Sequence, residues 1–206
     1  MSARFMGAAG ALLLVISGPS GVGKDTVLAT LRKRHSKDDR HFVTTVTTRR
    51  PRQRERPGVD YHFLDMARFE QLRDSGALLE WANNHGNWYG TPRDQVMEAL
   101  AGGRDAICKL DVKGARAIRA LAPSAVTIFV KPPSREILLA RLLKRGAETA
   151  EEIARRTRDA DNELAMEPLY DHVVVNHEGG VDRTARTIDR IIADEHTRHP
   201  ERRVAL

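Results

Sequence analysis

Apolar positions along the chain alternate between short continuous runs and stretches with helical spacing. The continuous runs cover residues 12–17, 106–110, 125–130 and 172–175. Runs of this length between turn-forming residues are typical of strands that are buried on both faces of a parallel sheet. The alternation of such runs with helical patterns predicts an α/β fold, a parallel sheet with helices on both faces.

Several segments carry helix signals. Residues 27–34 follow the first predicted strand and have helical spacing. Asp65 is expected to cap a helix over residues 66–74, and Ser134 is expected to cap another. Residues 149–152, Thr-Ala-Glu-Glu, form a capping box, which predicts the start of a third helix.

The segment from residue 43 to residue 93 has a different composition. It is rich in Thr, Arg, Pro, Gly, Asn and aromatic residues, and its apolar stretches are short. We expect a subdomain of short strands and loops, inserted into a single domain (residues 1–206) whose core comprises residues 10–42 and 94–198. Binding residues are common on such loops.

The beginning and the end of the sequence allow simple interpretations. Residues 6–16 form an apolar stretch after Arg4, which on its own is typical of a short secretory signal. The stretch runs directly into a glycine-rich loop without a cleavage-like site, and we therefore favour a buried strand.

No apolar run reaches the roughly 18 residues of a membrane span, so we expect no membrane insertion. Residues 196–206, rich in His and Arg, are expected to be frayed and solvated.

Composition narrows the class of protein. Of the 206 residues, 41% are hydrophobic and 30% are charged, which excludes disorder, collagen and coiled coil for the whole chain. The single cysteine, Cys108, excludes an intrachain disulfide framework and a four-cysteine zinc site. Lys and Arg outnumber Asp and Glu by 34 to 28, which favours a partner that carries phosphates. The basic residues are scattered, so a solvated arginine-rich surface explains them equally well, and no block indicates nucleic-acid binding.

A glycine-rich loop links the first predicted strand to the first predicted helix. Its sequence, Gly-Pro-Ser-Gly-Val-Gly-Lys at residues 18–24, matches the phosphate-binding motif in the context that the motif requires. Glycines let backbone N–H groups converge on an anion, and the following helix adds its positive end. Lys24 is expected to bridge the outer phosphates. The predicted ATP-phosphate residues are Gly18, Pro19, Ser20, Gly21, Val22, Gly23, Lys24, Asp25 and Thr26.

Asp25 departs from the common motif, because Ser or Thr usually follows the lysine and binds Mg²⁺. Thr26 can take that role through a water, or Asp25 can take part itself. A carboxylate that faced the triphosphate would be repelled unless magnesium or an arginine lay between them. The sequence leaves both roles open.

Residues 44–61 combine arginines with hydroxyl groups. Arg49 and Arg52 are three residues apart and can bind one phosphate together, and Tyr61 can add a neutral donor. A surface hairpin held by salt bridges explains the same pattern equally well. Farther along, Glu80 can accept hydrogen bonds from the adjacent N1–H and N2 amine of guanine, whereas adenine would leave its charge unpaired. Thr45 or Thr91 can donate to the guanine O6.

The ordered set of motifs resembles guanylate kinases, a family of P-loop nucleoside monophosphate kinases, from Leu12 to about Ile192. The matching segments are residues 17–24, 47–52, 58–63, 79–82, 86–92, 111–115, 132–134, 141–142, 145–148 and 173–176. The resemblance implies a core parallel sheet, a GMP-binding subdomain and a mobile helical lid at about residues 144–160. It implies transfer of the γ-phosphate of ATP to GMP or dGMP with Mg²⁺, in purine nucleotide metabolism.

The resemblance also implies roles for individual residues. Residues matching Arg49, Arg52, Tyr61 and Tyr89 hold the acceptor phosphate, and those matching Thr45, Glu80, Thr91 and Asp111 bind guanine. Lys24, Arg49 and the lid residues Arg141, Arg145 and Arg156 are the expected catalytic cations, Asn176 lies near adenine, and Thr26 is the candidate magnesium ligand. We expect a cytoplasmic monomer or homodimer with ATP and GMP as partners and no nucleic acid.

Two further positions depart from the family pattern. Lys109 stands two residues before Asp111, where a second carboxylate is usual, so it can alter magnesium or guanine contacts or pair with Asp111. Gln53 and Arg54 replace a common Pro-Gly pair before Glu55.

Three alternatives remain for comparison. A ribose 1,5-bisphosphate phosphokinase shares the Gly-Lys-Asp sequence of the loop, but the intact GMP-binding segment argues against it. A phosphopeptide-binding scaffold of the same fold usually has a damaged phosphate loop, which this chain does not have. A nucleic-acid-binding protein needs a continuous basic face.

Overall fold

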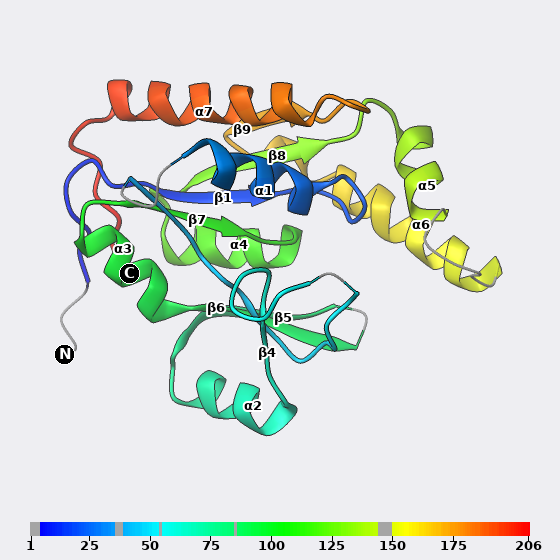
Figure 1. Cartoon of the computed structure of the whole chain (residues 1–206), viewed down its shortest axis with the longest axis horizontal. Coiled ribbons are helices and arrows are strands. Elements are labelled where there is room, and N and C mark those ends of the chain that lie inside the picture. The colour runs from blue at the N-terminus through cyan, green and yellow to red at the C-terminus, as the bar shows by residue number, and fades with distance from the viewer. Residues whose placement is uncertain (1–4, 36–38, 54, 85, 144–149) are drawn as a thin grey trace.

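Five parallel strands form the central sheet of the protein, shown in Figure 1 as a computed structural model. The structure describes residues 5–35, 39–53, 55–84, 86–143 and 150–206. The strand order is β2-β7-β1-β8-β9, so the chain passes from β1 to one edge of the sheet and later returns to fill the other edge. The strands are β1 (Leu13–Ser17), β2 (Arg40–Phe42), β7 (Asp105–Lys109), β8 (Val126–Lys131) and β9 (His172–Val175).

Helices cover both faces of this sheet, as predicted. Leu14 and Ile16 of β1 pack in one core with α1 (Lys24–Arg34) and α7 (Val181–Arg198). Leu13 and Val15 point to the opposite face and pack in a second core. Figure 1 shows α1 and α7 above the sheet, and α3 (Arg93–Ala101) and α4 (Val112–Leu121) below it. These four β1 side chains are fully buried, which is why this part of the strand is a continuous apolar run.

The prediction of a fully buried strand is wrong for residues 172–175. This segment forms β9, which pairs only with β8 and lies at the edge of the sheet, and Val173 is 40% exposed. At the other edge, β2 is three residues long, and sequence patterning did not reveal it. Helix α1 begins at Lys24, three residues before the predicted start, because Gly23 ends the loop with a left-handed φ of 98°.

A separate mixed sheet lies beside the core and comes from the predicted insertion. Its strand order is β4-β3-β6-β5, and β3 pairs in parallel with β4 and antiparallel with β6. Val46, Phe69 and Leu78 form its own small core. As predicted, Asp65 caps α2 by accepting a hydrogen bond of 2.8 Å from the Arg68 N–H. The elements are β3 (Val46–Thr47), β4 (His62–Phe63), α2 (Met66–Asp74), β5 (Leu78–Asn84) and β6 (Asn87–Pro92).

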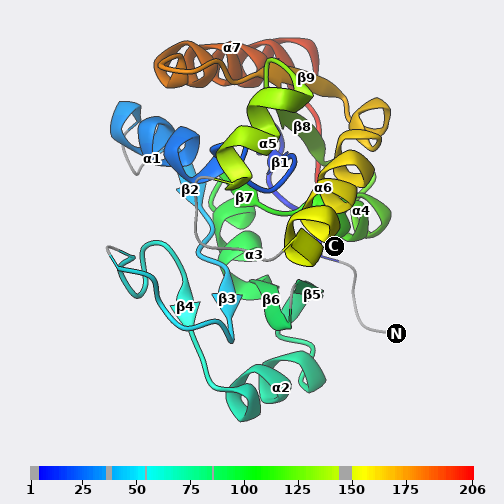
Figure 2. The ribbon, with the colours of Figure 1, turned by 90° about the vertical axis from the view of Figure 1, so that its right-hand side faces the viewer.

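Helices α5 (Arg135–Leu143) and α6 (Ala150–Leu164) lie beyond the carboxyl ends of the core strands, nearest the reader in Figure 2. The 3₁₀ turn η1 (Glu167–Leu169) follows α6. Leu138 and Leu142 of α5 are buried in the α1-side core, and the Ser134 hydroxyl accepts a long 3.4 Å bond from the Ile137 N–H. The predicted cap Thr149 and the predicted lid residue Arg145 lie outside the described residues. Among the described helices, none is both long and apolar enough to cross a membrane.

The expectation of a frayed tail at residues 196–206 is wrong. Helix α7 continues to Arg198, and the chain then returns to the core, where Val204 is fully buried. Phe5 and Leu206 exchange two backbone hydrogen bonds of 3.0 and 3.1 Å, and the Gly7 N–H donates to the Val204 carbonyl at 2.9 Å. A short apolar end after a run of polar residues has no periodicity, so the pattern alone indicated solvation.

Replacement of Val204 by alanine is expected to lower the free energy of unfolding by about 2 kcal/mol, because it leaves a cavity in the core below the sheet. Urea unfolding at equilibrium measures this loss. Glu201→Ala, an exposed change in the same segment, is the matched control and is expected to have little effect. Equal stability of the two variants would contradict the docked tail.

Candidate active site

The loop after β1 requires glycine at three positions. Gly18, Gly21 and Gly23 have φ values of 139°, 84° and 98°, which side-chain-bearing residues rarely adopt. A Cβ at Gly18 would collide with the Val130 carbonyl group, and one at Gly23 would lie 2.8 Å from the Asn176 Nδ2. The loop is therefore packed tightly between β8 and Asn176, and it leads directly into the N-terminus of α1, a favourable position for a phosphate.

Lys24 folds back over this loop. Its Nζ donates hydrogen bonds to the Gly18 and Pro19 carbonyls at 2.5 and 3.1 Å. Burial lowers the pKa of Lys24, and the carboxylates of Glu163, Asp25 and Asp111 act in the opposite direction. The ammonium therefore lies at the loop, hydrogen-bonded to backbone oxygens that phosphate oxygens can replace.

Glu163 contacts the phosphate loop, a role that no sequence pattern predicted. The Ser20 N–H donates to Glu163 Oε2 at 2.9 Å, although the two residues are 143 positions apart. Burial raises the pKa of Glu163, while the Ser20 N–H and Lys24 act to lower it. A carboxylate bound to a loop amide shows that the loop favours an anion.

Asn176 and Arg141 brace the loop from its other side. Asn176 is 6% exposed, donates to the Val22 carbonyl at 2.8 Å and accepts from the Thr184 hydroxyl at 3.0 Å. The Arg141 guanidinium lies 3.4 Å from the Val22 carbonyl and 3.5 Å from the Asn176 carbonyl. The structure thus brings two predicted site residues to the phosphate loop. Arg156 lies on α6 and is partly buried.

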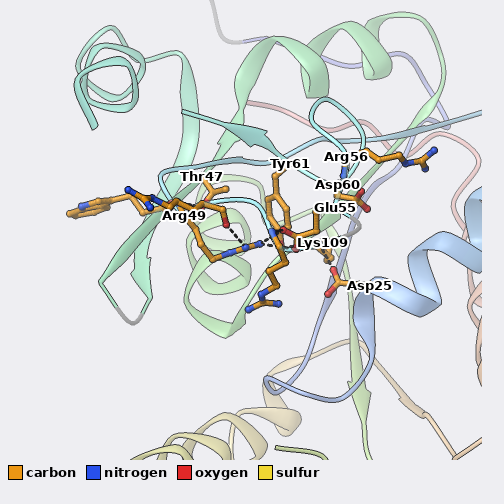
Figure 3. Close-up of polar contacts among 11 residues, drawn as sticks. Asp25, Thr47, Arg49, Glu55, Arg56, Asp60, Tyr61 and Lys109 are labelled. Carbon is orange, nitrogen blue, oxygen red and sulfur yellow. Dashed lines mark hydrogen bonds and ion pairs between the residues drawn. The ribbon is translucent and has the colours of Figure 1, made fainter. Parts of the chain in front are cut away.

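Arg49 lies in the inserted sheet region and is held by Glu55. Its Nη2 contacts both carboxylate oxygens at 2.8 and 3.0 Å, and the guanidinium lies 5.4 Å from the Tyr61 ring centre (Figure 3). The Arg52 N–H also donates to Glu55, at 2.7 Å, while its side chain is exposed. Glu55 therefore occupies the place of a shared anion between the two residues. The Arg49–Arg52 phosphate fork stays a prediction.

Two tyrosines line the same region. Tyr61 and Tyr89 pack edge to face with ring centres 6.0 Å apart. Burial raises the pKa of Tyr61 further above neutrality, although Lys109 acts to lower it, so its hydroxyl remains a donor at neutral pH. Arginine and tyrosine donors gathered in one place are suited to a phosphate monoester.

Asp25 faces a lysine, Lys109, a partner that was not predicted from the sequence. Lys109 forms an ion pair with Asp25 and donates to the Tyr61 hydroxyl at 2.9 Å. The alternative in which Lys109 pairs with Asp111 is not what the structure shows. Asp111 instead caps α4, accepting from the Gly114 N–H at 2.7 Å, and also accepts from the Asn84 side chain.

Glu80 is a buried carboxyl next to a buried hydroxyl. It is 6% exposed, and it accepts a 2.6 Å hydrogen bond from Thr91, its neighbour across the β5–β6 pair. Burial raises the pKa of Glu80 to about 7, and the Asp111 charge adds to this effect. Such a shift at a buried acid marks a candidate binding residue. Thr45 is also buried, directly before β3.

A cleft of about 840 Å³ opens next to these residues. Asn84 and Asp111 line one end, and α4, the end of α6 and η1 form its walls. Asn84 was not a predicted site residue, since an asparagine in a polar strand carries no distinctive signal.

Magnesium has oxygen donors near the phosphate loop. The Asp25 carboxyl and the Thr26 hydroxyl are exposed on the first turn of α1, and oxygen is the donor that Mg²⁺ prefers. Among the described side chains, no group of three or more His, Cys, Asp or Glu forms a complete metal centre. These two donors therefore suit an ion held mainly by phosphate oxygens and water.

A phosphate loop after the first strand of a parallel sheet, with a lysine at the start of the next helix, defines a P-loop nucleotide-binding protein. The sequence model of the guanylate kinase family matches residues 11–195. The chain therefore belongs to the guanylate kinase family, and its activity is that of a guanylate kinase, the phosphorylation of GMP by ATP.

Individual relatives agree with this assignment. The guanylate kinase of Mycobacterium leprae is 49% identical over 166 residues, covering 80% of this chain and 78% of that protein. The guanylate kinase of Gloeobacter violaceus is 44% identical over 185 residues, 89% of each chain. The crystal structure of guanylate kinase from Anaplasma phagocytophilum superposes with a TM-score of 0.73 at 29% identity, covering 93% of this chain and 88% of that one.

Proposed function

We propose that the two halves of the site each bind one of the two substrates. The loop at residues 18–26 binds the phosphates of ATP, and the inserted sheet binds GMP, within one domain formed by residues 1–206. The buried pair of Glu80 and Thr91 carries this proposal, because a desolvated carboxyl with a raised pKa is costly unless it has a ligand to bind.

Guanine recognition rests on the chemistry of Glu80. Its ionised carboxylate accepts from the N1–H and the N2 amine of guanine, and Thr91 keeps one oxygen oriented. Adenine has no N2 amine and would leave a buried charge unpaired. Ribose 1,5-bisphosphate has no base to offer. We assign Thr45 and Asp111 to the same base-binding group.

Phosphoryl transfer then depends on positioning and charge. Arg49, Arg52, Tyr61 and Tyr89 hold the phosphate of GMP in line with the γ-phosphate of ATP, and Lys24 neutralises charge on the group in transfer. Arg141, Arg145 and Arg156 add positive charge from the lid, at about residues 144–160, and lid closure excludes water. Asn176 orients the ATP side of the loop.

A magnesium ion is proposed as the metal cofactor. Asp25 and Thr26 offer the oxygen donors that would hold it, Thr26 through a water. The ion, when bound, neutralises phosphate charge. We also propose that the enzyme is a monomer or a homodimer. We place the enzyme in the cytoplasm, where both nucleotides are metabolites.

The acceptor-phosphate assignment can be tested by comparing GMP with guanosine, which lacks the phosphate. Arg49→Met is expected to weaken GMP binding by about 10- to 100-fold and to leave guanosine binding unchanged. Titration calorimetry measures both affinities. The control is Arg50→Met, an adjacent exposed arginine, which should behave as the wild type. If Arg49→Met weakened GMP and guanosine equally, Arg49 would not be a phosphate ligand.

A further inference from the structure

Lys109 lies between the two halves of the site. It is the last residue of β7 and pairs in register with Ile16, one residue before the end of β1. Because both strands are parallel, Lys109 comes out at the same edge of the sheet as the phosphate loop. Figure 3 shows its side chain between Asp25 on α1 and Tyr61 in the inserted segment.

The contacts of Lys109 join the ATP side to the GMP side. The Nζ forms an ion pair with Asp25, next to Lys24, and donates to the Tyr61 hydroxyl at 2.9 Å. It also lies 4.2 Å from the centre of the Tyr61 ring. The Lys109 side chain is only 13% exposed, whereas that of Asp25 is 70% exposed. The ammonium is thus fixed in place, while its carboxylate partner is open to solvent and to incoming ligands.

The hydrogen bond from Lys109 limits where the Tyr61 hydroxyl can donate its proton. An ammonium has donors only, so the Tyr61 oxygen must accept from Lys109. The Tyr61 O–H proton then points elsewhere and can be donated to a phosphate oxygen. Burial acts to lower the pKa of Lys109, but Asp25 and Tyr61 together outweigh it, and the pKa lies above its ordinary value. Lys109 therefore remains a cation at neutral pH.

We propose that Lys109 is an additional ligand of the acceptor phosphate, and that this phosphate displaces Asp25 from the ammonium. The proposal rests on the acceptor site assigned above, and it adds a cation that the family resemblance did not assign. The phosphate of GMP competes with Asp25 for the ammonium, because both are anions and the carboxylate is the more exposed partner. Asp25 is accordingly a competitor of the substrate phosphate, and Lys109 contacts substrate.

The first experiment measures the affinities of GMP and guanosine by calorimetry for Lys109→Met, which keeps the aliphatic stem. GMP binding is expected to weaken by about 10- to 100-fold, guanosine binding to stay unchanged, and Lys109→Arg to recover part of the loss. Lys33→Met, at an exposed position of α1, is the matched control and should bind both ligands as the wild type does. Equal weakening of both ligands, or of neither, would overturn the proposal.

A second variant, at an exposed side chain, keeps the test decisive if Lys109→Met folds poorly. Asp25→Asn removes the competing charge, so GMP binding is expected to tighten several-fold, and guanosine binding to stay the same. In the Lys109→Met background the same change should bring no gain, because the ammonium is gone. Weaker GMP binding in Asp25→Asn would contradict the competition.

The outcome also separates this inference from the acceptor site itself. If Arg49→Met lowers the preference for GMP over guanosine and Lys109→Met does not, the acceptor site stands and the role of Lys109 fails. If neither variant changes that preference, the acceptor phosphate is bound elsewhere and both assignments fail.

Discussion

Lys24→Met is expected to lower kcat by about 10³-fold while the affinity for GMP stays within a few-fold of the wild type. The reason is positional: the Lys24 ammonium lies at the phosphate loop, bonded to the Gly18 and Pro19 carbonyls, where it can move to phosphate oxygens. Methionine keeps the stem and removes only the charge. A coupled assay of ADP release with ATP, GMP and magnesium measures the loss.

The control for this variant is Lys33→Met, an exposed lysine on the same helix. It should turn over as fast as the wild type. If Lys24→Met kept more than a tenth of the activity with an unchanged melting temperature, Lys24 would not be a source of transition-state charge.

Glu80→Gln is expected to lower kcat/KM for GMP by about 10³-fold and to erase most of the preference for GMP over AMP. The glutamine amide can accept from only one of the two guanine donors, and its NH₂ group opposes the other. Initial rates with both nucleotides measure this preference. Glu98→Gln, at an exposed position of α3, is the matched control. A retained preference in Glu80→Gln would place base recognition on other residues.

The raised pKa of Glu80 adds a pH signature to the same variant. With a pKa of about 7, the carboxyl changes from mostly protonated at pH 6 to mostly ionised at pH 8, so the KM for GMP should fall about tenfold over that range. The Gln variant should show only the ionisation of the GMP phosphate. Burial favours the protonated Glu80 carboxyl in the folded state. The contribution of Glu80 to the free energy of unfolding therefore declines as pH rises from about 4.5 to 7. Glu80→Gln is therefore expected to be the more stable protein at pH 8.

The parts of the fold that depend on local pattern could be predicted from the sequence. Strand β1, the loop at residues 18–24 and α1 follow one another, and each has its own signal in hydrophobicity or glycine content. Asp65 could be identified as a cap because capping involves residues only three positions apart. Strand β9 differed, since its apolar pattern did not reveal that it forms the edge of the sheet.

Contacts between distant residues could not be predicted in this way. Lys109 and Asp25 are 84 positions apart, and only the register of β7 against β1 brings them together. In the sequence, Glu163 is indistinguishable from the other polar residues of its helix. Its contact with the phosphate loop depends on how α6 packs in the fold. Family resemblance supplied the shared residues of the site, but the role of a residue that departs from the family pattern, such as Lys109, needed the structure.

The pairing of the two ends of the described chain has a topological consequence. Phe5 and Leu206 are joined by backbone hydrogen bonds at the amino ends of the core strands, whereas the nucleotide loop lies at their carboxyl ends (Figure 1). A short linker between residues 206 and 5 would turn the chain into a closed ring without altering the edge of the sheet where phosphate is transferred. New termini could then be opened at the exposed turn around Gly76, so the order of elements along the chain can change while the chemistry does not.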